Sequence, residues 1–243
     1  MTSLMRVLVV LGVALVVGGY GVARVSATGP KNVPPAVTTF QTIPDGAHLF
    51  AQPSGRIQAY DARHPVTIEI QRDAARQEIA GFGFAVTGGS ASHLRAMSAS
   101  ARSALLDELF GQGDGAIGMS LIRISLGASD LETRPFSYNE NPDDLDHEGF
   151  SLGPHLEHLI PVLQEILAVN PDLEIMASPW SAPSWMKTNG SFVGGSLAEE
   201  YRDAYAAYII KYLEVMDQYG IQIDYLTVQN EPLYTGNNPS MYM

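Results

Sequence analysis

Residues 174–180 read Glu174-Ile175-Met176-Ala177-Ser178-Pro179-Trp180, a short apolar run that stops at a proline and an aromatic side chain. A short run bounded in this way is typical of a buried β-strand. We therefore expect a strand over residues 174–178, and the segments on either side of it decide which kind of sheet it joins.

Helical patterns flank this strand on both sides. Upstream, apolar residues at helical spacing precede Asn170-Pro171, which stops the helix, and Pro161 lies either at a kink or in the first turn. Downstream, Ser196 and Glu199 have the spacing of a capping box, and Gly220 closes the helix. The residues that we expect to pack against the sheet are Leu156, Leu159, Ile160, Leu163, Ile166 and Leu167 upstream, and Tyr201, Tyr205, Tyr208, Ile209, Tyr212, Leu213 and Met216 downstream.

The alternation continues outward, with one more helix from near Ser98 to Gly111 and strands over residues 82–86, 120–125 and 225–229. Strands that alternate with helices predict a parallel sheet. Four such units without a dinucleotide-binding glycine pattern favour an α/β fold, the first half of a (β/α)8 TIM barrel. A doubly wound sheet is the alternative, because periodicity alone does not separate the two.

The part of the chain ahead of the barrel divides into three. Arg6, an apolar run over residues 7–23 and the small residues 25–27 predict a signal peptide or a membrane anchor over residues 1–27, and hence a secreted, periplasmic or cell-surface protein. The uncleaved anchor would tether the protein to a membrane. Residues 28–46 are rich in Pro and Thr and are interpreted as a linker. Residues 47–78 are expected to form an N-terminal β segment, because residues 66–70 alternate, and residues 79–243 the truncated barrel.

Composition excludes several classes of function. The formal net charge of −12 leaves no excess of Lys and Arg to neutralise phosphates, so a nucleic-acid partner is not expected. The absence of cysteine excludes disulfides, thiolate metal sites and cysteine nucleophiles. His155 and His158 have helical spacing without an evident third ligand, so they are interpreted as a solvated helix face, and neither a metal nor a cofactor is expected.

Polar, acidic and aromatic residues follow each predicted strand. In a parallel barrel the functional groups project from the carboxyl ends of the strands. The second strand carries Arg123, and the strands run in turn into Thr87-Gly88-Gly89-Ser90, Ser129-Asp130, Trp180 and Gln229-Asn230-Glu231-Pro232. These groups are therefore expected at one rim.

Three kinds of residue at this rim suggest chemistry. Glu231 follows an apolar run, where a partly desolvated carboxyl group would have a raised pKa and could protonate a leaving oxygen; the alternative is an exposed loop glutamate. Arg123 in an apolar strand needs a partner, either a rim carboxylate or a purely structural ion pair. Trp180 and Trp185 share one proline-containing loop, where indole faces could stack on sugar rings or plug the barrel mouth.

Residues 81–243 resemble glycoside hydrolase family 30, which includes glucosylceramidases and β-1,6-glucanases. The motifs that carry the resemblance occur in order: Gly81-Phe82-Gly83, Arg123-Ile124-Ser125, Ser129-Asp130, Asn141-Pro142-Asp143-Asp144, Ala177-Ser178-Pro179-Trp180, Trp185-Met186-Lys187-Thr188-Asn189-Gly190 and Asn230-Glu231-Pro232. The resemblance implies a retaining β-glycosidase that acts on a β-glucoside or β-glucan without a cofactor. In it Glu231 matches the acid/base and Asn230 the residue that binds the sugar 2-hydroxyl. Arg123, Asp130 and Trp180 match residues that line the subsite for the cleaved sugar, and Trp185 is taken as a further substrate contact.

The sequence departs from this family pattern in two places. A retaining mechanism needs a second carboxylate roughly 5 Å from the first, and the family carries it at the end of a seventh strand that these 243 residues do not include. The chain by itself is therefore expected to be inactive and poorly stable, with open strand edges. Gly88 stands where many members have an acidic residue, which removes an expected acceptor for sugar hydroxyls and weighs against glucosylceramide as substrate.

Four functions remain open after this reading. The leading interpretation is a retaining hydrolase of β-glucosidic bonds that is similar to glucosylceramidases. A β-1,6-glucanase or another β-glycanase of the same family is the alternative within that class. A non-catalytic sugar-binding barrel would keep the tryptophans but would not need Glu231. An aldolase or dehydratase would require a strand-end lysine or metal-ligating carboxylates, and neither stands out.

Overall fold

A computed structural model of the chain describes residues 22–23, 39–44, 46–47, 51, 67–68, 71 and 73–243. The chain forms two compact units, residues 1–78 and residues 79–243. In the first unit, β1 (Val22–Ala23) pairs in parallel with β2 (Thr67–Ile68), which lies inside the strand expected over residues 66–70. Most of the predicted leader and linker lies outside the described residues. Within the described part of the chain, no helix is both long and apolar enough to span a bilayer.

The second unit is built on a four-stranded sheet in which every pair of neighbouring strands is parallel. The strands follow one another in sequence order: β3 (Gly83–Ala85), β4 (Leu121–Leu126), β5 (Glu174–Pro179) and β6 (Tyr225–Leu226). All four were expected at these places, although β6 ends before residue 229. Arg123 is in register with Ala85 on one side and with Met176 on the other.

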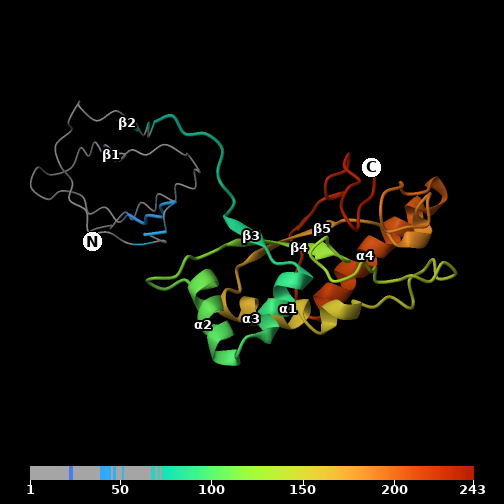
Figure 1. Cartoon of the computed structure of the whole chain (residues 1–243), viewed down its shortest axis with the longest axis horizontal. Coiled ribbons are helices and arrows are strands. Elements are labelled where there is room, and N and C mark those ends of the chain that lie inside the picture. The colour runs from blue at the N-terminus through green and yellow to red at the C-terminus, as the bar shows by residue number, and fades with distance from the viewer. Residues whose placement is uncertain are drawn as a thin grey trace, which may run out of the picture. The chain divides into compact units, whose positions relative to one another are not determined.

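Four α-helices lie on one side of this sheet (Figure 1). They are α1 (Gly88–Ala96), α2 (Ala99–Phe110), α3 (Leu159–Val169) and α4 (Arg202–Gln218). A sheet whose strands keep sequence order, with its helices on one face, has the winding of a (β/α)8 barrel, whereas a doubly wound sheet reverses its order. The structure therefore confirms the predicted fold class, with four parallel strands and the three helical connections between them.

The helix boundaries follow local signals in most places. Ser98 caps α2 by accepting from the backbone N–H of Ala101 at 3.3 Å, and Gly111 ends that helix, as expected. Pro161 is the third residue of α3 and so lies in its first turn, where its missing N–H costs nothing. Gly220 follows α4 with a φ of +72°, a conformation that favours glycine.

The capping box predicted for α4 is wrong. The helix begins at Arg202, after a single 3₁₀ turn over Glu199–Tyr201, and no side chain caps its first residues. Ser196 lies too far upstream to cap, and its backbone N–H instead donates to Thr188 Oγ1 at 3.1 Å. A loop contact with a residue outside the local pattern thus decides the role of this serine.

The sheet has an apolar face and a mixed face. Ile122, Ile124, Ile175 and Ala177 alternate along β4 and β5 and are fully buried in the core. The core continues into α3, whose face toward the sheet is apolar, and into the tyrosines of α4. The buried residues of these two helices are Leu159, Ile160, Val162, Leu163, Ile166, Tyr205, Tyr208, Tyr212 and Met216. Arg123, between two of the buried isoleucines, points to the other face of the sheet.

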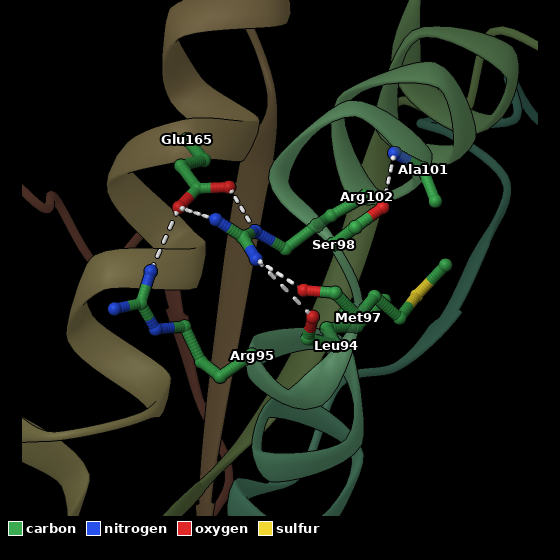
Figure 2. Close-up of polar contacts among 7 residues, drawn as sticks. All are labelled: Leu94, Arg95, Met97, Ser98, Ala101, Arg102 and Glu165. Carbon is green, nitrogen blue, oxygen red and sulfur yellow. Dashed lines mark hydrogen bonds and ion pairs between the residues drawn. The ribbon is translucent and has the colours of Figure 1, made fainter.

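An ion-pair cluster holds three of the helices together (Figure 2). The Arg102 guanidinium of α2 grips both carboxylate oxygens of Glu165 on α3, at 2.6 and 3.1 Å. It also donates to the backbone oxygen of Met97, at 3.3 Å, beyond the end of α1. Arg95 of α1 reaches the same carboxylate at 3.2 Å. A forked guanidinium suits such a junction because its donors point in several directions at once.

Candidate active site

The residues that follow the four strands meet at one edge of the sheet, because the strands are parallel and run in the same direction. Arg123 lies within β4, Trp180 directly follows β5, and Asn230 and Glu231 come four and five residues after β6. The candidate site is built from these groups and from the residues that orient them.

Arg123 is the centre of the candidate site. Its Nη2 donates to Ser178 Oγ and to Asn230 Oδ1, both at 2.8 Å. Its Cζ lies 4.7 Å from the centroid of the Trp180 ring, which places the cation over the indole face. Three residues that the sequence singled out, Arg123, Trp180 and Asn230, are therefore in direct contact.

The expected carboxylate partner of Arg123 is not a direct contact. Its hydrogen bonds go to a hydroxyl and an amide, and among the described residues no ion pair of Arg123 is recorded. Partial burial lowers the pKa of Arg123, while the negative charges of Asp130 and Glu231 oppose that effect through space. Asp130 itself is exposed. The arginine is thus solvated by neutral polar groups, with two carboxylates in its electrostatic environment.

The segment after β6 is fastened to the end of β5. The backbone N–H of Asn230 donates to the Pro179 oxygen at 2.8 Å, and Gln229 Nε2 donates to the Trp180 oxygen at 2.6 Å. Below them, the Ser178 and Thr227 hydroxyls are 2.5 Å apart and share a hydrogen bond. These contacts extend the pairing of the two strands past the last residue of β6, and they fix where Asn230 and Glu231 point.

Glu231 has an unusual backbone conformation, with a φ of +45°. Such a left-handed conformation is costly for a residue with a side chain and is concentrated at functional sites. Its carboxylate accepts a short hydrogen bond from Asn237 Nδ2, and its backbone oxygen accepts from Tyr234 N at 2.9 Å. The loop that follows the strand therefore helps to hold the carboxylate in place.

The expected desolvation of Glu231 is not found, because the residue is exposed. It follows the last strand of the sheet, and its neighbours on that side are also open: Val228 is 73 % and Leu233 77 % exposed. Within the part of the chain that the structure describes, no element packs over this edge.

The two tryptophans have different surroundings. Trp180 is buried beneath Arg123, and its Nε1 finds no partner among the described residues. Trp185 donates from Nε1 to the Asn139 oxygen at 3.0 Å and packs edge-on against Tyr201, with ring centroids 5.1 Å apart. The structure thus brings Trp180 to the Arg123 cluster and gives Trp185 a packing contact near the start of α4.

Two buried groups were missed or misread in the sequence. Lys187 is buried, and its Nζ donates to Ser181 Oγ at 2.9 Å and to the Ser240 oxygen at 2.7 Å; burial lowers the pKa of Lys187 to about 8. His155, interpreted as part of a solvated helix face, is buried and hydrogen-bonded on both ring nitrogens. Only His158 of that pair is partly exposed. The described residues contain no group of three side chains suited to hold a metal ion.

Comparison with known proteins identifies a family for most of the second unit. The model of the glycosyl hydrolase family 30 TIM-barrel domain matches residues 79–241. The endo-1,6-β-D-glucanase BGN16.3 of Trichoderma harzianum is 38% identical over 194 residues, which cover 73% of this chain and 39% of the glucanase. The lysosomal acid glucosylceramidase of Mus musculus is 31% identical over 192 residues, 75% of this chain and 37% of that enzyme.

A solved structure agrees with the sequence relatives. The endo-β1,6-glucanase BT3312 superposes with a TM-score of 0.74 at 33% identity, over 85% of this chain and 46% of that chain. The present chain spans less than half the length of the curated relatives that it matches. The order of strands, the polar rim and these matches agree with the resemblance found in the sequence motifs. The chain belongs to glycosyl hydrolase family 30.

Proposed function

We propose that the whole protein is a retaining hydrolase of β-glucosidic bonds, and that Glu231 is its general acid/base. The observation that carries the proposal is the contact of Arg123 with both Trp180 and Asn230, directly beside Glu231 at the carboxyl ends of the strands. In this scheme Glu231 protonates the leaving oxygen and then deprotonates the attacking water. The nucleophile is a second carboxylate about 5 Å away, supplied from outside these 243 residues.

The hydrogen bonds of Arg123 assign a direction to the Asn230 amide. Because a guanidinium only donates, the atom of Asn230 that faces it must be the oxygen. The Asn230 Nδ2 is then left to donate to a sugar hydroxyl next to the reacting carbon. The Trp180 ring is held under the cation on one side, which fixes its orientation as a wall of the sugar subsite.

For the substrate we propose a β-1,6-glucan, with glucosylceramide as the second candidate. The first relatives found are endo-1,6-β-D-glucanases at 33% to 38% identity, against 31% for the mouse glucosylceramidase. This ordering reverses the one favoured by the sequence alone. It is checked by measuring kcat/KM of the whole protein on a β-1,6-linked glucan and on glucosylceramide; a clear preference for the lipid would reverse it again.

The role of Glu231 is tested with Glu231→Gln in the whole protein. We expect hydrolysis of an unactivated β-glucoside to fall at least ~100-fold, while an aryl glycoside with an acidic leaving group is affected less, because its departure needs little protonation. The control variant is Glu214→Gln on α4. Asp130→Asn is not used as a control, because Asp130 belongs to the proposed site. An equal loss of activity on both substrates would argue that Glu231 is not the acid. NMR of the product would show inversion at the anomeric carbon if the enzyme were not a retaining one.

We further propose that the protein is exported. The support is the arrangement of Arg6, the apolar residues 7–23 and the small residues 25–27 in the sequence. The N-terminus of the mature protein is expected at Thr28. Recovery of the protein with its first residues intact in the membrane fraction would instead favour an anchor, and recovery from the cytoplasm would contradict export.

A further inference from the structure

A second carboxylate lies at the same rim as the Arg123 cluster. Glu132 comes six residues after the end of β4, and it lies against Gly88, which follows β3 by three residues. Both positions are at the carboxyl ends of neighbouring parallel strands. Glu132 therefore belongs to the edge of the sheet where the sugar site is proposed, on the β3 side of Arg123.

Glu132 occupies the space of the side chain that residue 88 lacks. A Cβ on Gly88 would overlap the Glu132 Oε1 and lie 2.6 Å from His155 Nε2. A Cβ on the next residue, Gly89, would overlap the Leu131 oxygen. The loop after β4 can approach the start of α1 this closely only because both residues are glycines. Gly88 has no side chain that could accept a hydrogen bond, but Glu132 brings a carboxylate to the same place at the rim.

A buried pair of side chains orients this carboxylate. His155 is 2 % exposed; its Nε2 lies 3.1 Å from Glu132 Oε1, and its Nδ1 lies 2.8 Å from the Tyr138 hydroxyl. Because the Glu132 carboxylate only accepts, Nδ1 is the ring nitrogen that accepts, and it does so from the Tyr138 hydroxyl, which burial keeps protonated by raising the pKa of Tyr138. The imidazole N–H is then at Nε2, and it donates a hydrogen bond to Glu132 Oε1.

The supporting residues are themselves fixed by aromatic packing. The Tyr138 ring stacks on Tyr212 with an interplanar angle of 3° and a centroid distance of 5.8 Å. Phe136 meets the His155 ring edge-on at 5.1 Å. A carboxylate that was only exposed to solvent would not need buried, rigidly packed side chains to hold it in one orientation. Such second-layer support is typical of groups that must be held ready for a ligand.

The carboxylate still has capacity for a ligand. Its side chain is 12% exposed, and within the described part of the chain no donor is recorded for the second oxygen, Oε2. A depression of about 410 Å³ opens beside it, lined by Glu132, Thr133, Arg134, Phe136, Gly153, Pro154 and Glu157. An ionised carboxylate can only accept, so the ligand group that fits is a hydroxyl or another donor.

We propose that Glu132 binds a hydroxyl group of the saccharide substrate and so contributes to substrate specificity, while His155 and Tyr138 act as its positioning residues. The inference rests on the proposed function, because it needs a sugar in the site. The hydroxyl donates to Oε2, and Oε1 stays bound to His155. The saccharide then lies between the Trp180 side of the rim and this wall.

The experiment is a binding measurement that does not depend on hydrolysis. Trp180 and Trp185 are the only tryptophans in the chain, so their fluorescence reports ligand at the rim. Methyl β-D-glucopyranoside and its monodeoxy analogues are titrated into the whole protein and into Glu132→Gln. Glutamine keeps the size of the side chain and can still accept from His155, so this variant is expected to fold. Glu214→Gln on α4 is the control, because Glu214 is exposed and does not line the depression.

We expect Glu132→Gln to weaken binding of the parent glucoside about tenfold, since a hydrogen bond to a charged acceptor is lost, and Glu214→Gln to leave it unchanged. For one monodeoxy analogue, wild type and Glu132→Gln should bind equally, because the hydroxyl in question is missing from that ligand. An equal loss for every analogue would mean that Glu132 only supports the fold, and would overturn the inference. Unchanged binding of all sugars by Glu132→Gln would also overturn it while leaving the proposed glycosidase intact. A wild-type protein that binds none of the sugars but is folded would contradict both.

Discussion

Arg123 contacts three other residues of the candidate site and orients them relative to one another. Its guanidinium orients the Asn230 amide, lies over the Trp180 ring and is anchored by Ser178, all without a direct ion pair. A direct salt bridge to Glu231 would favour the ionised form of a carboxyl group and so oppose the acid role proposed for this residue. Arg123 instead donates to the neutral side chains of Ser178 and Asn230.

We predict that Arg123→Lys lowers kcat/KM of the whole protein about 10- to 100-fold on a β-glucoside. An ammonium group on a flexible stem cannot hold Ser178 and Asn230 in the geometry of the planar guanidinium, so Asn230 loses its fixed orientation. The size of the effect corresponds to one or two hydrogen bonds to a charged group. Arg202→Lys on α4, whose side chain is 68% exposed, is the matched control. Unchanged kinetics in Arg123→Lys would show that the arginine does not position Asn230.

Lys187 gives a pH prediction with a definite sign. Its pKa is lowered from 10.5 to about 8 by burial, so between pH 8 and 10.5 the unfolded chain holds more protons than the folded one. The titration of Lys187 therefore makes the free energy of unfolding rise with pH across this range, and the rise is complete above pH 10.5. Below pH 8 the buried ammonium reduces stability.

The measurement is denaturant unfolding of wild type and Lys187→Met between pH 7 and 11. The stability of wild type relative to Lys187→Met is expected to rise as the pH increases from 8 to 10.5, because only wild type carries the titrating amine. Lys211→Met on α4 serves as the control lysine. A constant difference across the range would contradict the lowered pKa of Lys187.

For individual residues, the sequence predicted which side chains meet at the ends of the strands. It did not predict which side chains are buried by contacts with distant parts of the chain. Arg123, Trp180 and Asn230 could be found because a parallel sheet brings the ends of its strands together. The role of His155 could not, because its partners Tyr138 and Glu132 lie 17 and 23 residues away in the chain. Likewise, Lys187 is held by Ser240, 53 residues away. Periodicity carries no information about such contacts.

Among the α-helices, α1 was the one not expected. It begins with Gly88 and Gly89, which are poor helix formers, and Thr87 caps it by accepting from Ser90 N at 3.2 Å. The glycines are explained by the loop after β4, which lies against them. The strands and the other three helices were predicted because their apolar spacing agrees with the fold. Where packing of a distant loop selects the residue type, local propensity gives the wrong answer.

Gly83 provides a prediction for the pairing of β3 with β4. A Cβ at this position would overlap the backbone oxygen of Leu121, its partner in register, so the two strands fit together only with glycine there. Gly83→Ala is expected to reduce the free energy of unfolding by about 1–3 kcal/mol, the usual cost of overpacking. Gly113→Ala, which has open space around it and no positive φ, is the control. Equal stabilities of the two variants would show that the β3–β4 contact is looser than described.

On the scale of the whole molecule, the sheet of the second unit has an exposed apolar edge beside β6. β6 is the last strand of the sheet, and the residues around and after it are exposed: Leu226 by 42%, Val228 by 73%, Leu233 by 77% and Tyr234 by 55%. The parallel order of the strands was predictable from the alternation of elements. The open surface beside Glu231 was foreseen as an open strand edge, but its consequence for the burial of that glutamate was not.

We predict that residues 79–243, produced alone, associate with one another and bind a hydrophobic dye. An unpaired strand with exposed apolar side chains is a template for intermolecular pairing, and the chain covers only 37% to 39% of the length of the compared relatives. Light scattering at increasing concentration and dye fluorescence would show this. The double variant Val228→Lys/Leu233→Lys should associate less, because charge on an edge opposes pairing, whereas Ile210→Lys, an exposed apolar residue on α4, should not change the result. A monomeric unit that does not bind the dye would mean that residues 79–243 protect this edge by themselves. The exposure of Glu231 would then be a property of the site and not of an open edge beside it.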